Sequence, residues 1–146
     1  MASVIAVCLS EAKGTPKHEV SEVCLKEGHG IVGDAHAGNW HRQISLLGTE
    51  SVEKLKVVLP NLPAGAFAEN VLTEGIVLYE LPVGTKLQIG HTLLEITQIG
   101  KECHASCAIR RQTGDCVMPR EGVFAIVLKG GVIRSGDEIT ILRQSH

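Results

Sequence analysis

Aromatic residues and clusters of positive charge are scarce in this chain. Two Phe, one Trp and one Tyr make up only 3% of the 146 residues, so few rings are available to stack on bases. The 14 Lys and Arg are outnumbered by 16 Asp and Glu, the formal net charge is −2, and no basic tract occurs. Because nucleic-acid-binding proteins normally carry a basic surface, we expect no nucleic-acid partner.

Long apolar runs are absent as well. No stretch approaches the ~20 residues needed for a membrane-spanning helix. The first residues, Met1 to Cys8, lack the positive charges that begin a signal peptide. We therefore expect no membrane partner and a cytoplasmic location, where thiols stay mostly reduced. The five cysteines are an odd number, so at least one has no intramolecular disulfide partner.

Hydrophobic residues and glycine are plentiful. Hydrophobic residues make up 44% of the chain, enough for a core of Val, Ile and Leu. The 16 glycines allow many turns. The length predicts a single domain, 1–146, large enough to fold without disulfides. Short apolar runs that alternate between glycine turns predict a mainly β fold of short, largely antiparallel strands in a closed or partly open β-barrel. The predicted strands cover 4–9, 20–25, 43–47, 86–89, 92–99, 123–128, 132–133 and 138–142.

One helix is predicted near 50–59. Thr49 is a suitable N-cap, and Val52, Leu55 and Leu59 recur at helical spacing before Pro60 ends the segment. The polar segment 10–17 and the glycine- and histidine-rich segment 28–38 are predicted to be loops.

The first cluster of polar side chains lies at 33–43. Asp34 could hold His36 or His41 in one tautomer, and Arg42 could bind an anionic oxygen. In the alternative reading, Asp34 merely closes a turn and the histidines lie on the surface. The spacing of His36 and His41 is not by itself that of a metal site.

The second cluster surrounds Cys103, which directly follows the predicted strand 92–99. Lys101 and His104 flank it, and Arg111 follows nearby. Cations beside a cysteine favour its thiolate, the form that attacks electrophiles, binds metals or carries sulfane sulfur. From its neighbours alone, Cys103 could be a sulfur carrier, a metal ligand, a nucleophile or half of a disulfide.

The other cysteines admit further alternatives. Cys103, Cys107 and Cys116 could bind zinc, although their spacing differs from the paired-knuckle pattern. A redox disulfide between Cys103 and Cys107 is another alternative, although the spacing of these two cysteines differs from that of the C-x-x-C redox motif. Cys8 and Cys24 lie within apolar strand patterns, so we expect both to be small buried hydrophobic residues.

Taken in order, motifs along the chain resemble those of small stand-alone MOSC-domain proteins, the module named for the C-terminus of molybdenum cofactor sulfurases. The resemblance extends over about residues 20 to 142, and each motif is weak alone whereas the ordered set is specific. The matching motifs are Gly33-Asp34-Ala35-His36-Ala37-Gly38, His41-Arg42-Gln43-Ile44-Ser45-Leu46-Leu47, Phe67-Ala68-Glu69-Asn70-Val71, Leu81-Pro82-Val83-Gly84, Leu87-Gln88-Ile89-Gly90, Thr97-Gln98-Ile99-Gly100-Lys101-Glu102-Cys103-His104, Gly122-Val123-Phe124 and Gly136-Asp137.

The resemblance implies a MOSC-type β-barrel and assigns roles to individual residues. Cys103 matches the family's hallmark cysteine, which is proposed to carry sulfur as a persulfide or to ligate molybdenum. The resemblance implies that Asp34, His36, Arg42 and Asn70 line the same pocket. Arg42, with Lys101 or Arg111, would meet the anionic phosphate of the pterin in the molybdenum cofactor.

The function implied is handling of the molybdenum cofactor, by binding it or by carrying sulfane sulfur on Cys103 for assembly of the cofactor or of metal-sulfur clusters. One alternative is a molybdenum-dependent reductase of N-hydroxylated compounds with an external electron donor, and another is a non-catalytic zinc-binding partner protein. Sulfur transferase and oxidoreductase activities thus both remain open. The sequence contains no pyridoxal-phosphate domain and no ferredoxin spacing, so we expect a separate desulfurase, sulfur donor or reductase as partner.

Overall fold

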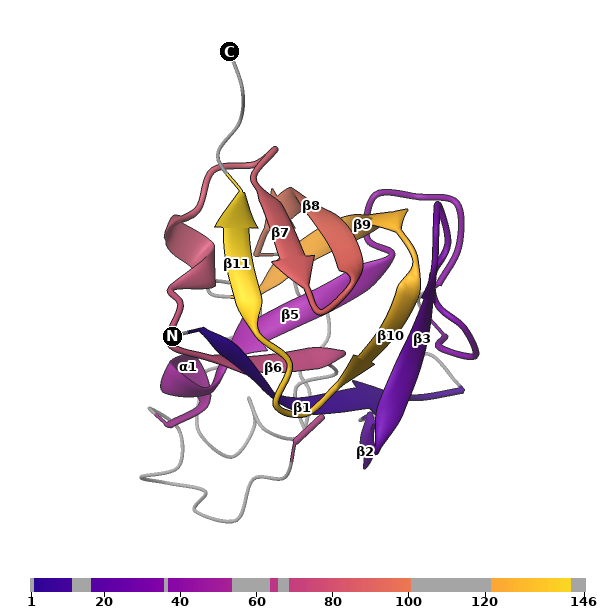
Figure 1. Ribbon diagram of the computed structural model, residues 1–146, viewed down its shortest axis with the longest axis horizontal. Helices are drawn as coiled ribbons and strands as arrows, with labels where there is room; N and C mark the ends of the chain where they lie inside the picture. The colour runs from indigo at the N-terminus through magenta and orange to yellow at the C-terminus, as the bar shows by residue number, and fades with distance from the viewer. Residues whose placement is uncertain are drawn as a thin grey trace.

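The computed structural model describes residues 2–11, 17–35, 37–53, 64–65, 69–100 and 122–142, and the fold is mainly β, as predicted (Figure 1). Most strands belong to an eight-stranded sheet in the order β11-β7-β8-β9-β5-β6-β1-β2. Its strands in chain order are β1 (Ser3–Leu9), β2 (His18–Val20), β5 (Ile44–Gly48), β6 (Val71–Glu74), β7 (Lys86–Ile89), β8 (Thr92–Ile99), β9 (Val123–Lys129) and β11 (Ile139–Leu142).

A second, three-stranded sheet has the order β10-β3-β4. It consists of β3 (Glu22–Lys26), β4 (Gly30–Ile31) and β10 (Gly131–Arg134). All the strand pairs recorded in the two sheets are antiparallel except β5 with β6, which is parallel. The prediction of largely antiparallel strands is therefore confirmed.

The sheets are not closed into a barrel. Within the described residues, β2 and β11 end the eight-stranded sheet without pairing with each other. An isolated bridge between Ser3 and Glu138 brings the start of β1 beside the residue that precedes β11. The sheet therefore curls round its core as a barrel does, although no ladder among the described residues closes it.

The core lies inside this curl and consists almost entirely of aliphatic side chains. Alternation explains which residues enter it: in β7, Leu87 and Ile89 are fully buried while Gln88 is exposed. The central strand β5 is buried along its whole length because both of its faces are covered. Side chains from ten strands meet in the core, including Val4, Val7, Val23, Leu25, Ile31, Ile44, Leu46, Val71, Leu87, Ile89, Leu94, Ile96, Val123, Val127, Ile133 and Ile139.

The predicted segment 20–25 is two strands rather than one. Ser21 separates β2, which pairs with β1, from β3, which pairs with β10 in the other sheet. This division also overturns the expectation that Cys24 is buried. β3 alternates between exposed and buried residues, and Cys24 lies on its exposed face.

Helical structure is limited in the described residues. The predicted helix begins as α1 (Thr49–Glu53), and residues 54–59 of that prediction lie outside the described residues. A short 3₁₀ helix, η1 (Leu78–Glu80), was not predicted. Strand β6 was not predicted either, although it joins β1 to β5.

Candidate functional site

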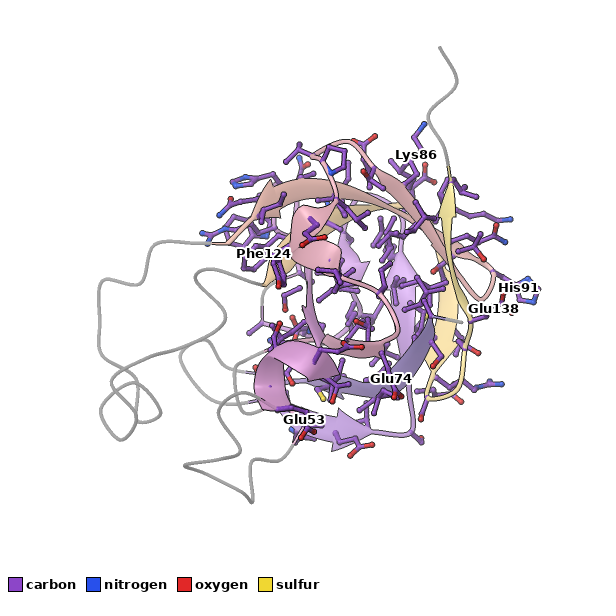
Figure 2. All side chains as sticks on the ribbon, turned by 90° about the vertical axis from the view of Figure 1, so that its left-hand side faces the viewer. Glu53, Glu74, Lys86, His91, Phe124 and Glu138 are labelled. Atoms are coloured by element: carbon purple, nitrogen blue, oxygen red, sulfur yellow. The ribbon has the colours of Figure 1, made fainter. Side chains whose placement is uncertain are left out.

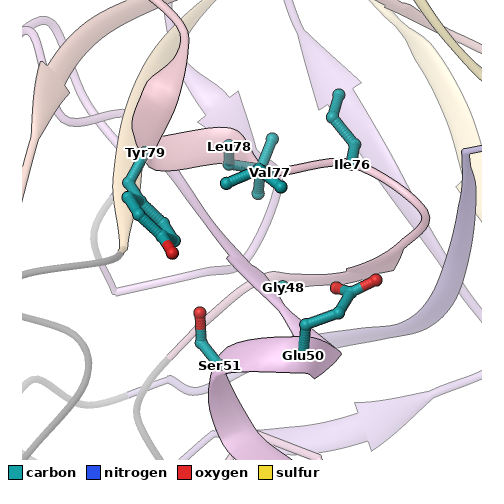
Figure 3. A pocket seen from close by; sticks show the side chains of 7 residues that line it. All are labelled: Gly48, Glu50, Ser51, Ile76, Val77, Leu78 and Tyr79. Atoms are coloured by element: carbon teal, nitrogen blue, oxygen red, sulfur yellow. The ribbon is translucent and has the colours of Figure 1, made fainter.

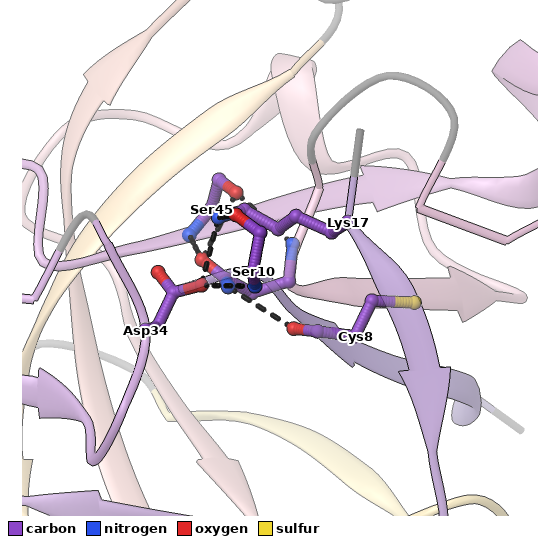
Figure 4. Close-up of polar contacts among 6 residues, drawn as sticks. Cys8, Ser10, Lys17, Asp34 and Ser45 are labelled. Atoms are coloured by element: carbon purple, nitrogen blue, oxygen red, sulfur yellow. Dashed lines mark hydrogen bonds and ion pairs between the residues drawn. The ribbon is translucent and has the colours of Figure 1, made fainter. Parts of the chain in front are cut away.

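A buried ion pair joins the loop after β1 to the loop after β4 (Figure 4). The Nζ of Lys17 lies 2.7 Å from Oδ1 of Asp34, and neither side chain is exposed to solvent. Asp34 Oδ1 also accepts a hydrogen bond from the Ser10 N–H at 3.1 Å, and Lys17 Nζ lies 3.3 Å from Ser10 Oγ. Since a buried charge is costly unless it is paired, these contacts fix the two loops against each other.

The same lysine is tied to a third loop through its backbone. The Lys17 N–H donates to the Gly65 carbonyl, and the Gly65 N–H donates to Oε2 of the buried Glu69. A Cβ on Gly65 would lie only 2.1 Å from the Lys17 carbonyl oxygen, and its φ is +88°. Glycine is therefore required where these loops approach each other.

Asn70 forms a second buried network, which links β1 to β5. Its Oδ1 accepts hydrogen bonds from the backbone N–H of Ser45 at 2.9 Å and from the Ser45 hydroxyl at 3.1 Å. Its Nδ2 donates to the Cys8 carbonyl at 3.1 Å, and the residue is 0% exposed. The Asn70 side chain thus holds strands together from inside the protein.

Arg42 lies just before β5 and is placed against aromatic rings. Its Cζ is 4.6 Å from the ring centroid of Trp40 and 5.6 Å from that of Phe124. Within the described part of the chain, its Nε is buried and has no hydrogen-bond partner. Aromatic contacts orient the guanidinium, and an unpaired buried donor favours an anionic acceptor.

His41 is joined to the end of β8. Its Nε2 lies 2.8 Å from Oε1 of Gln98, and Nε2 of Gln98 donates to the Gly100 carbonyl at 2.7 Å. The Thr97 hydroxyl donates to the His41 carbonyl. We call the group of Trp40, His41, Arg42, Thr97, Gln98, Gly100 and Phe124 the strand-end site, because it lies where β5 and β9 begin and β8 ends.

The strand-end site and the Asn70 network meet on β5. Ser45, the partner of Asn70, pairs with Phe124 across the β5–β9 ladder. Phe124 lies on the opposite side of the molecule from His91 in the β7–β8 turn (Figure 2). At the base of the segment that carries Cys103, the Gly100 N–H donates to the Gly122 carbonyl at 2.6 Å.

The two described cysteines differ in environment. Burial raises the pKa of the Cys8 thiol to about 12, and the negative charges of Glu69 and Glu19 act in the same direction. Cys8 is 0% exposed, so the prediction that it packs as a small hydrophobic residue is confirmed. A thiol so strongly held in its protonated form is a poor nucleophile.

The predicted site residues fall into two groups. Asp34, Arg42 and Asn70 are described; Asp34 and Asn70 bind other parts of the protein, whereas Arg42 Nε has no hydrogen-bond partner among the described residues. The remaining predicted residues lie outside the described residues, together with the proposed zinc ligands: His36, Lys101, Cys103, Cys107, Arg111 and Cys116. Sequence reasoning missed Lys17, because a lysine in a polar segment gives no sign of burial.

A separate open pocket lies between α1 and η1 (Figure 3). Ile76, Val77 and Leu78 line it together with Ser51 and Tyr79. Glu50 also lines it, and its Oε2 accepts a hydrogen bond from the Gly75 N–H at 2.8 Å. Of the predicted site residues that the structure describes, Asp34, Arg42 and Asn70, none lines this pocket.

The family model of the MOSC domain matches residues 33–140. The chain belongs to the MOSC-domain family. The match begins just before Asp34 and ends within β11, so it includes Arg42, Asn70, Cys103 and the whole strand-end site. The resemblance noted in the sequence motifs is therefore confirmed.

Solved structures share the fold of this MOSC domain at low sequence identity. YuaD from Bacillus subtilis aligns with a TM-score of 0.78 and 19% identity over 95% of this chain and 94% of that chain. YiiM from Geobacillus stearothermophilus gives 0.72 and 17% over 98% of this chain and 76% of that chain. YiiM from Escherichia coli gives 0.71 and 17%, with 99% of this chain and 71% of that chain covered. A search of curated protein sequences found no match.

Two further observations concern membranes and metals. No helix among the described residues is long and apolar enough to span a membrane. In the same residues, no group of three or more His, Cys, Asp or Glu side chains could hold a metal ion.

Proposed function

We propose that this MOSC protein handles the molybdenum cofactor, by binding it or by carrying sulfane sulfur on Cys103 for assembly of the cofactor or of metal-sulfur clusters. MOSC domains are linked to cofactor binding and to sulfur handling, and the family match spans the segment that contains Cys103. The proposal is carried by one observation: the buried Nε of Arg42 lacks a hydrogen-bond partner among the described residues.

The strand-end site suits an anionic ligand. Arg42 supplies a permanent positive charge, and its contacts with Trp40 and Phe124 hold the guanidinium in one orientation. The cofactor, when bound, would supply a molybdenum centre and an anionic phosphate. We propose that Arg42 binds that phosphate, with Lys101 or Arg111 contributing further charge and His36 a hydrogen bond.

The buried residues would support this site from beneath. We propose that Asp34 and Asn70 act by positioning, since both are committed to internal hydrogen bonds. Asp34 fixes the start of the loop that leads to Arg42. Asn70 fixes Ser45, which lies opposite Phe124 on β9.

Cys103 would perform the sulfur chemistry. Its thiolate attacks the terminal sulfur of a donor persulfide, the sulfur–sulfur bond of the donor breaks, and the donor leaves as a thiolate. Cys103 then holds the persulfide, and no net oxidation takes place. The sequence places Cys103 three residues beyond Gly100, the residue that closes the base of its segment.

A transfer assay tests this chemistry. The purified protein is incubated with glutathione persulfide, and tandem mass spectrometry locates the added sulfur. We expect Cys103 to be loaded first and Cys103→Ser to lose this loading. Cys24→Ser is the matched control because Cys24 is an exposed thiol on β3. Loading of Cys24 in preference to Cys103 would refute the sulfur-carrier role.

A further inference from the structure

The three-stranded sheet β10-β3-β4 covers one side of the core, and β10 and β3 lie side by side at the right of Figure 1. Side chains alternate along its strands, so one face of the sheet is buried and the other is exposed. The opposite face points away from the core and is open to solvent. The buried face contributes to the core the side chains of Val23, Leu25, Ile31 and Ile133.

Three apolar side chains form a row across the exposed face, which we call the apolar row. Val132 in β10 pairs directly with Cys24 in β3. On the other side, the Cys24 carbonyl accepts a hydrogen bond from the Val32 N–H at 2.9 Å, which continues the β3–β4 ladder. Val32 is 52% exposed, Val132 is 36% exposed, and Cys24 is exposed as well. Single exposed apolar residues are ordinary, whereas a contiguous exposed patch is typical of an interaction surface.

Residues of opposite charge flank the apolar row along β3. Glu22 lies two residues before Cys24 and Lys26 two residues after it, so all three side chains project from the same face. Arg134 Nη2 lies 3.3 Å from Oε1 of Glu22, whereas Lys26 forms no ion pair with a described residue. Lys26 pairs across the ladder with Gly30, which has no side chain to cover it. Along β3 the face therefore runs from acidic through apolar to basic.

We propose that this face docks against the same face of a second copy of the chain. A two-fold axis that lies between the facing sheets, perpendicular to their strands, runs β3 of one copy antiparallel to β3 of the other. The two apolar rows then cover each other, and Cys24 of each copy lies opposite that of the other. Lys26 of each copy faces Glu22 of the second copy, so the charge pattern is complementary to itself. In a parallel arrangement like charges would meet instead.

The dimer should be weak and reversible. Stable interfaces bury about 800 Å² on each partner, whereas this face offers only the apolar row and its flanking charges. Sedimentation velocity of the full chain, from micromolar to millimolar concentration, should show a mass that rises from that of the monomer towards that of the dimer. A wild-type chain that stays monomeric throughout overturns the proposal and leaves the face to a different partner.

Variants of exposed apolar residues test which surface is used. Val132→Glu places a charge in the apolar row and should weaken dimerisation at least about tenfold, because a charge is costly to bury without a counter-charge. Ile141→Glu makes the same kind of change at an exposed residue of β11 and should dimerise as the wild type does. Circular dichroism shows that both variants are folded. A Val132→Glu protein that dimerises as strongly as the wild type, or equal weakening in Ile141→Glu, would contradict the proposal.

Charge reversal tests the antiparallel arrangement. Lys26→Glu places an acid opposite Glu22 of the second copy, so the dissociation constant of the dimer should rise about tenfold or more. The double variant Glu22→Lys, Lys26→Glu restores opposite charges across the interface and should recover part of the lost affinity. A double variant no tighter than Lys26→Glu alone argues against this arrangement.

A short bis-maleimide locates the two-fold axis. Each thiol adds across one maleimide double bond, so a link between two Cys24 residues forms only where the thiols of two copies are close. At a concentration at which the wild type is dimeric, tandem mass spectrometry should find this link in the wild type, and much less of it in Val132→Glu. A dimer in which Cys24 is not linked to Cys24 of the second copy would overturn the arrangement.

Discussion

Lys17 Nζ and Asp34 Oδ1 form an ion pair of 2.7 Å from which solvent is fully excluded. Removing one partner deprives the other buried charge of its counter-charge at 2.7 Å. We therefore expect Lys17→Met and Asp34→Leu each to lower the free energy of unfolding by about 3–5 kcal/mol. The double variant should lose less than the sum of the two, which urea denaturation of all four proteins will measure.

The exposed pair of Arg134 and Glu22 is the control. These side chains are 61% and 51% exposed and 3.3 Å apart. Substitution of Arg134 with Met should change the free energy of unfolding by only about 0–1 kcal/mol, because solvent screens the pair. Equal losses at the two pairs would contradict the role given to burial.

Asn70 holds β1 and β5 together through three hydrogen bonds to Ser45 and Cys8. Asn70→Ala should lower the free energy of unfolding by about 2–4 kcal/mol, since unpaired buried groups cost about 1–3 kcal/mol each. The exposed Asn39 provides the matched control, and Asn39→Ala should have little effect. Thermal and urea unfolding measure both, and an Asn70→Ala protein as stable as the wild type would refute this assignment.

Cys8 should be inert toward thiol reagents in the folded protein. Burial raises the pKa of its thiol to about 12, so the folded state keeps the proton that the unfolded chain loses near pH 9. This contribution to stability is present below pH 9 and is lost as the pH rises towards 12. Alkylation at pH 9 should modify the exposed Cys24 and leave Cys8 unmodified until urea unfolds the protein.

Arg42 should form an anion site that needs a planar guanidinium. At constant ionic strength, phosphate should raise the melting temperature of the wild type more than chloride does, because ligands that bind only the folded state stabilise it. Arg42→Ala should abolish this difference. Arg42→Lys should reduce it strongly, since an ammonium does not reproduce the contacts with both rings. If phosphate stabilised the Arg42→Lys variant as much as the wild type, stacking of the guanidinium on the two rings would not be needed for anion binding. Arg134→Lys serves as the surface control.

Regular alternation made most strands predictable. β7 and β8 have the predicted bounds, since Lys86–Ile89 and Thr92–Ile99 alternate on either side of a Gly90-His91 turn. The segment 20–25 was predicted wrongly, because its apolar pattern runs through Ser21 and cannot show that neighbouring residues join different sheets. β6 went unpredicted because four residues give little pattern and its pairing with β5 is non-local.

The site was predictable only in part. Arg42 stands out in the sequence as a cation beside Trp40 in a polar loop, and the structure places both together. The burial of Lys17 depends on Asp34, which lies 17 residues away, and no local signal records it. The contact of His41 with Gln98 spans 57 residues, so spacing alone could not reveal it.

The most direct test of the proposed function is the composition of the protein purified from cells that make the molybdenum cofactor. Native mass spectrometry, metal analysis and pterin fluorescence should detect a Cys103 persulfide or a molybdenum-bearing pterin, and Cys103→Ser should lose it while Cys24→Ser retains it. A wild-type protein with neither group, or a Cys103→Ser protein loaded as fully as the wild type, would contradict the account. About one zinc per chain in place of molybdenum and pterin would instead favour the zinc-binding alternative.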